Sequence, residues 1–125
     1  MSAHETNLLI QTSGDVTLVS FLDISILSHS QIRSLGDELL MIAAQKHVKN
    51  LLLDFHDVRY LSSEMLGTLV AVYKRIFTRR GRLRLCSMEA DLLQLLDTLG
   101  LDRVFEIYPD QESALASFGT TRGRA

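Results

Sequence analysis

The stretch LLLDFHDVRYLSSEMLG, residues 51–67, decides how this chain folds. Its first part, Leu51–Phe55, is apolar without the alternation of a half-exposed strand. That pattern predicts a strand covered on both faces, as central parallel strands are. Ser62 and Ser63 then precede an apolar helical pattern and can cap its free amide groups. The stretch therefore predicts a strand in the middle of a sheet, followed by a helix.

The residues before this stretch predict a hairpin and a helix. Two short β-type runs, Leu8–Ile10 and Val16–Phe21, are separated by the turn-rich letters TSGD. From about residue 30 to about residue 47, apolar side chains recur at spacings of three and four, which is typical of an amphipathic helix. Ser28 or Ser30 is available as its N-cap.

The residues after this stretch predict a second helix. Its apolar stripe consists of Met65, Leu66, Leu69, Val70, Tyr73, Ile76 and Phe77. Gly81 follows a basic last turn, so we expect it to take the left-handed conformation that often ends helices.

The remaining chain predicts two strands and two helices. An alternating strand at Leu83–Cys86 comes first, and a leucine-rich helix ending at Gly100 follows it. A last strand at Val104–Ile107 precedes a fourth helix, which opens at Pro109 and Asp110. The order of elements predicts an α/β fold: a mixed sheet of about five strands, with an N-terminal hairpin and then parallel strands, flanked by four helices.

Length and composition favour one domain with a real core. The chain has 125 residues, of which 46% are hydrophobic and 22% charged, close to the average for globular domains. We expect a single domain over residues 1–118. Residues 119–125 are polar and contain glycine, so we expect a flexible tail there.

Charge and hydropathy exclude several classes of partner. The net charge is -2, which disfavours a dedicated nucleic-acid binder. No apolar run is long enough to cross a bilayer, and residues 1–7 lack the basic charge of a secretory signal. We therefore expect a cytoplasmic protein that does not bind membranes. The single cysteine, Cys86, lies in an alternating strand pattern and is interpreted as a core residue.

Catalysis and metal binding have little support in the sequence. Asp23, Asp54 and Asp57 are spaced as strand-end and turn residues rather than as paired catalytic acids. The four histidines are scattered, and there is no second cysteine. We predict no catalytic residue, no metal site and no cofactor, and hence a protein that is not an enzyme.

A group of basic residues near the end of the second helix leaves two interpretations open. It is either a patch for phosphate or an acidic partner, or a solvated helix end that complements the helix dipole, and we favour the solvated helix end. The residues are Lys74, Arg75, Arg79, Arg80, Arg82 and Arg84.

The run Leu51–Gly67 resembles the core of STAS domains, the family of bacterial anti-sigma factor antagonists, in which a strand leads to an Asp-Ser-Ser-Gly-Leu-Gly motif. Phe21-Leu22-Asp23 is similar to the family's Gly-x-Leu-Asp after the hairpin. Further similarities are at Arg80-Gly81, at Leu99-Gly100-Leu101 and in the last helix, so the resemblance covers nearly the whole chain.

The chain departs from the family motif at its switch position. With Leu66-Gly67 as the anchor, the family's Asp falls on Ser62, its first Ser on Ser63 and its phosphorylated Ser on Glu64. Met65 then takes the place of the motif's glycine. A carboxylate carries less charge than a phosphate, so Glu64 only partly imitates phosphoserine. The alternatives for Glu64 are a solvated acid in the first helical turn and a residue that sets partner specificity.

The resemblance implies a regulatory protein that binds an anti-sigma factor, commonly a serine kinase of the histidine-kinase-like ATPase type. It implies docking through Asp23, Ser62, Ser63, Glu64, Met65, Gly67 and Thr68, with Ser62, Ser63 and Glu64 as the regulatory positions and Ser62 or Ser63 as alternative phosphoacceptors. From the residues alone, the two serines fit simple helix capping as well as a docking or modification site. Two further alternatives are a self-associating scaffold module, as in stressosome-like assemblies, and a sensor of a small ligand or nucleotide.

Overall fold

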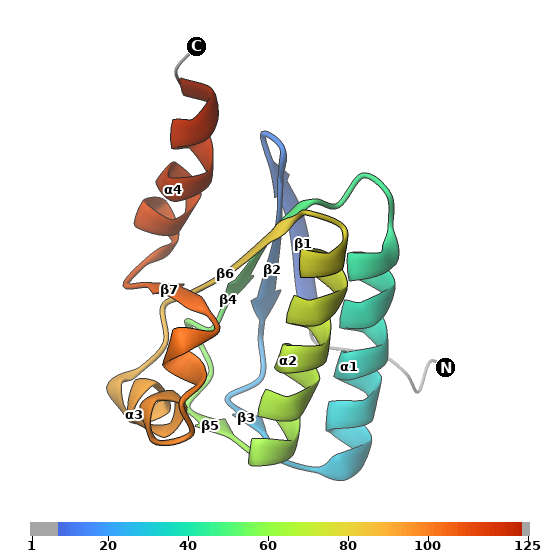
Figure 1. The fold of residues 1–125 in the computed structure, drawn as a ribbon. Coiled ribbons are helices and arrows are strands. Elements are labelled where there is room, and N and C mark those ends of the chain that lie inside the picture. Colours follow the sequence, from blue (N-terminus) through green and yellow to red (C-terminus); the bar gives the residue numbers. More distant parts are fainter. Residues whose placement is uncertain (1–7, 124–125) are drawn as a thin grey trace.

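The computed structural model describes residues 8–123, with side chains up to residue 119, as two sheets with helices packed around them (Figure 1). The elements follow the order β1 (Leu8–Ser13), β2 (Val16–Phe21), β3 (Ser25–Ile26), α1 (His29–Ala44), β4 (Asn50–Asp54), β5 (Tyr60–Leu61), α2 (Ser63–Thr78), β6 (Arg82–Cys86), α3 (Ala90–Thr98), a 3-10 turn (Leu101–Arg103), β7 (Glu106–Tyr108) and α4 (Gln111–Gly123).

The main sheet has five strands in the order β1-β2-β4-β6-β7. The first two strands are antiparallel, and every later pairing is parallel. Gly14 takes a positive φ of 61° at the first position of the two-residue turn between β1 and β2, as a type II′ hairpin requires. The predicted mixed sheet of about five strands, with β4 at its centre, is confirmed.

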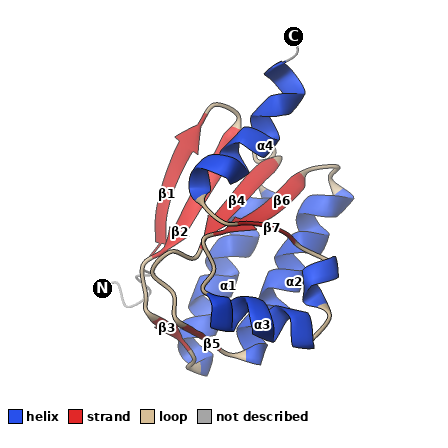
Figure 2. Cartoon of the chain, turned by 90° about the vertical axis from the view of Figure 1, so that its left-hand side faces the viewer, coloured by secondary structure: helices blue, strands red, loops and turns tan. Residues whose placement is uncertain are grey.

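The helices divide between the two faces of this sheet (Figures 1 and 2). The strand order never reverses from β2 to β7, so right-handed crossovers bring α1, α2 and α3 to one face. The chain then returns over the opposite face as α4. Leu53 of β4 belongs to the core beneath α1 and α2, and its neighbour Leu52 belongs to the core beneath α4. This burial on both faces is why the β4 sequence does not alternate.

Several details differ from the sequence predictions. Helix α1 ends at Ala44 rather than near His47, and a second small sheet joins β3 to β5. The side chain of Phe77 is exposed, because α2 uses Val72 rather than Phe77 to complete its buried stripe. Helix α4 continues to Gly123, past the tail boundary predicted at residue 119, whereas residues 124–125 lie outside the described range.

The end of α2 corrects the role predicted for Gly81. The left-handed residue is Arg80, with φ 62°, and Gly81 is not among the residues with positive φ. Glycine is needed at position 81 for another reason: a Cβ there would overlap the carbonyl oxygen of Lys49, which accepts the Arg82 amide at 2.7 Å. Close backbone approach, rather than backbone conformation, therefore selects this glycine.

Candidate protein-docking site

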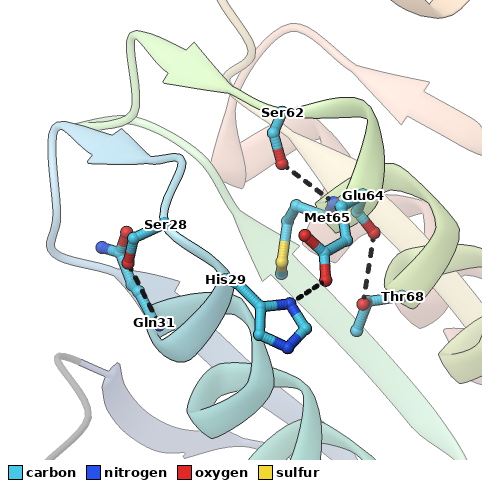
Figure 3. Close-up of polar contacts among 7 residues, drawn as sticks. All are labelled: Ser28, His29, Gln31, Ser62, Glu64, Met65 and Thr68. Carbon is cyan, nitrogen blue, oxygen red and sulfur yellow. Dashed lines mark hydrogen bonds and ion pairs between the residues drawn. The ribbon is translucent and has the colours of Figure 1, made fainter.

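Helices α1 and α2 begin side by side at one end of the molecule (Figure 3). Each follows a segment of the small β3–β5 sheet, in which Ser25 pairs with Tyr60 and Ile26 with Leu61. Because both helices present their N-terminal ends here, the positive ends of two helix dipoles lie together. This end of the fold favours negative charge.

Ser62 is the N-cap of α2. Its backbone is extended, and its hydroxyl oxygen accepts a hydrogen bond from the amide of Met65 at 3.2 Å. Its own amide donates to the carbonyl of Ile26 at 3.1 Å, which ties the start of α2 to β3. Ser63 is exposed at the first helical position. The capping role predicted for the serine pair thus belongs to Ser62.

Glu64 lies in the first turn of α2 and reaches across to α1. Its Oε2 atom is 2.7 Å from Nδ1 of His29, the first residue of α1. Because a carboxylate only accepts, the imidazole Nδ1–H donates this bond. The two side chains remain 49% and 72% exposed, so the contact is a solvated surface bridge. Beside it, a shallow hollow of about 270 Å³ separates the outer faces of the two helices.

Met65 and Thr68 are placed differently from Glu64. Met65 is fully buried, so its side chain fills the core and is not available to a partner. Thr68 is half-buried, and its hydroxyl donates to the Glu64 carbonyl at 3.4 Å. Gly67 is exposed, with open space around the position of a Cβ. Of the predicted docking residues on α2, Ser63, Glu64 and Gly67 are the ones that lie exposed at the surface.

Asp23 lies at the same end of the molecule, in the loop between β2 and β3. Gln31 of α1 holds this loop in place: its Nε2 donates to Asp23 Oδ2 at 3.2 Å and to the Ser25 carbonyl at 2.8 Å. Its Oε1 also accepts the Leu27 amide at 3.1 Å. Sequence reasoning missed Gln31, although Ser28 and Gln31 have the spacing of a capping box.

Four exposed apolar side chains lie on the segments that lead into α1 and α2. They are Leu22, Ile24, Leu27 and Tyr60, each close to half exposed or more. Three of them lie on the β2–α1 connection, and Tyr60 lies on β5. The backbone amide of Tyr60 donates to the Ile24 carbonyl at 3.1 Å. Solvated apolar side chains gathered with polar ones are typical of protein-interaction surfaces.

The remaining candidate groups have structural partners. Asp54 is buried and accepts from the His56 amide at 2.9 Å and from Gln111 Nε2 at 2.8 Å, as expected for a strand-end residue. Asp57 instead contacts the ring of His56 at 3.0 Å. Within residues 8–123, no three His, Cys, Asp or Glu side chains are arranged to hold a metal ion.

The basic residues do not form one patch. Arg79 reaches across to the carbonyl of Ala43. Arg84 is buried beneath α4, where its Nε lies 3.1 Å from Glu106 and its guanidinium stacks 4.6 Å from the centre of the Phe118 ring. The guanidinium of Arg82 also lies 5.7 Å from the centre of the Phe118 ring. Three of the six cations therefore contact neighbouring helices.

Cys86 lies in the core beneath α4, as predicted. Burial raises the pKa of its thiol to about 12. The described part of the chain also contains no helix whose length and hydropathy would let it cross a bilayer.

Comparison with known proteins identifies the family. The model of the STAS domain matches residues 9–114, and the chain belongs to this family. Among curated proteins, an anti-sigma F factor antagonist of Paenibacillus polymyxa is 24% identical over 118 residues, which cover 92% of this chain and 89% of the relative.

Solved structures share the fold. An anti-sigma-factor antagonist STAS domain protein from Planctomyces limnophilus matches with a TM-score of 0.77 and 21% identity, over 88% of this chain and 96% of that one. An anti-sigma factor antagonist from Mycobacterium paratuberculosis matches with a TM-score of 0.78 and 21% identity, over 93% of this chain and 96% of that one. The fold implied by the resemblance of residues 51–67 is therefore confirmed.

Proposed function

We propose that this STAS domain is a non-enzymatic regulator of the anti-sigma factor antagonist type, acting from the cytoplasm by binding a signalling protein. The observation that carries the proposal is the arrangement at the N-terminal ends of α1 and α2. The segments that lead into the two helices, residues 22–27 and Tyr60, carry exposed apolar side chains, and Ser63 and Glu64 are exposed in the first turn of α2. We name residues 22–27 together with 60–64 the docking surface.

The docking surface fits a protein partner better than a small substrate. Its apolar side chains are exposed to solvent, and the hollow of about 270 Å³ beside Glu64 is open and shallow. Large exposed side chains such as Tyr60 supply most of the binding energy when a partner desolvates them. The name of the curated relative points to an anti-sigma factor as this partner, and the resemblance of residues 51–67 implies a serine kinase of the histidine-kinase-like ATPase type.

Glu64 takes the switch position in this proposal. Its carboxylate sits in the field of two helix N-termini and is held by His29. Unlike a serine, it carries its charge without a kinase. We propose that Glu64 selects a partner with a complementary group, and that any phosphorylation uses the exposed Ser63, because the Ser62 hydroxyl caps α2.

The test is affinity capture from the native cell extract, with retained proteins identified by mass. Wild type is expected to retain an ATPase of the anti-sigma type, and Glu64→Arg and Tyr60→Asp are expected to lose it. Glu112→Arg on α4 and Met41→Asp on α1 are the matched controls, because they introduce the same charged residues at exposed positions outside the docking surface. Retention of the same ATPase by all five proteins, or by none of them, would refute the proposal.

A scaffold role through self-association is the second candidate. The observation that favours it is the uncharged outer edge of β1.

A further inference from the structure

Strand β1 forms one margin of the main sheet, and within residues 8–123 no strand or helix runs along its outer side (Figure 2). All six of its residues pair in register with β2, so the strand contains no bulge. Because the hairpin closes with a two-residue turn, Ser13 and Val16 are the hydrogen-bonded pair next to it. Alternation along the strand then turns the backbone groups of Leu8, Ile10 and Thr12 outward.

The two margins of the sheet differ in how they are protected. Strand β7, at the other margin, has only three residues, begins with the charged Glu106 and is followed by Pro109. Short length, charge and proline are devices that prevent a sheet edge from pairing with another strand. Strand β1, with the sequence LLIQTS, has none of them.

Strand β1 also exposes apolar side chains on both of its faces. Leu9 is 46% exposed and Ile10 is 47% exposed, and neighbouring residues of a strand point to opposite faces. Another strand paired along this edge would cover part of both side chains. The edge therefore offers free backbone groups and apolar area together.

We propose that β1 pairs antiparallel with β1 of a second copy of this chain, which joins the two main sheets into one continuous sheet. A twofold axis at Ile10 places Ile10 beside its own counterpart and Leu8 opposite Thr12. The outward backbone groups of these three residues then bond across the axis. The absence of charge in β1 means that two identical edges meet without repulsion. Ser63 and Glu64 of the docking surface lie in the first turn of α2, so dimerisation through β1 leaves them open, whereas Leu22 shares a hollow with Leu9 of β1.

The first test is sedimentation velocity of the full chain over about 1 to 100 µM. Wild type is expected to reach twice the chain mass of 14.1 kDa at the upper end of this range. Ile10→Lys is expected to stay monomeric, because two like charges would meet at the axis. Met41→Lys makes the same kind of substitution on α1 and is expected to dimerise like wild type.

The second test needs no substitution and so does not depend on a variant that folds. Amide hydrogen exchange of Ile10 and Thr12 in the wild type is expected to slow by about tenfold or more as the concentration rises through the dimer range. A chain that stays monomeric throughout would overturn the proposal and leave the edge to an extended segment of another protein. A dimer that Ile10→Lys preserves, or that leaves both amides unprotected, would overturn it as well.

Discussion

His29 Nδ1 lies 2.7 Å from Glu64 Oε2 and joins the first residue of α1 to the first turn of α2. The two residues are 35 positions apart in the sequence, and the bridge brings the imidazole of His29 to the carboxylate that we propose takes the switch position. The bridge thus holds an exposed residue of the docking surface from a neighbouring helix.

The His29–Glu64 bridge is expected to contribute little to folding. Both side chains are well exposed, so a double-mutant cycle of His29→Ala and Glu64→Gln should give a coupling free energy of about 0.2 to 1 kcal/mol in urea unfolding. Partner capture by His29→Ala should weaken nonetheless, because Glu64 loses its fixed position. A coupling free energy well above this range would show that the bridge is structural.

Alanine substitutions of the two serines at the start of α2 are expected to differ in their effect on the stability of the protein. Ser62→Ala removes the acceptor of the Met65 amide and should lower the free energy of unfolding by about 1 kcal/mol. Ser63→Ala should change it by less than about 0.5 kcal/mol, since Ser63 is exposed. Thermal and urea unfolding of the two variants measure this difference, and equal effects would contradict Ser62 as the cap.

Two glycines are expected to respond in opposite ways to alanine. Gly81→Ala forces a Cβ against the Lys49 carbonyl and should destabilise the fold by about 1 to 3 kcal/mol. Gly67→Ala meets open space inside a helix and should stabilise it by up to about 1 kcal/mol. Because Gly67→Ala preserves the fold, any loss of partner capture by this variant reports on docking. Urea midpoints of both variants provide the measurement.

The Cys86 thiol is expected to be unreactive in the folded protein. Its pKa of about 12 leaves almost no thiolate near neutral pH, and the side chain is fully buried. A thiol reagent at about pH 8 should label the protein only on unfolding in urea.

The same pKa predicts the sign of a pH effect on stability. Burial raises the folded pKa of the thiol above its ordinary value of 9.0, so the unfolded chain releases this proton first as pH rises. The contribution of Cys86 to stability is therefore constant below pH 9.0 and falls between 9.0 and about 12. The difference between wild type and Cys86→Ala in urea unfolding isolates it, and a difference that does not depend on pH would contradict the burial of the thiol.

Local patterns were enough to predict most of the fold. The unalternating Leu51–Phe55 marked the central strand, and Gly100, with φ 75°, ended the third helix as predicted. The small β3–β5 sheet was missed, because two-residue strands carry no periodicity. The apolar stripe of α2 includes Phe77, although its side chain is exposed. A stripe of apolar residues predicts which face of a helix is buried, but not how far along the helix the burial extends.

Residues close together along the chain are enough to predict the order of elements, the central position of β4 and the start of α2 at Ser62 and Glu64. Three features appear only in the folded chain: His29 contacts Glu64, Gly81 lies against the Lys49 carbonyl, and the outer edge of β1 is unpaired within residues 8–123. Each of these depends on segments brought together by right-handed crossovers and strand order. The residues in each contact lie far apart in the sequence, and no periodic pattern links them, so the sequence alone does not predict these contacts.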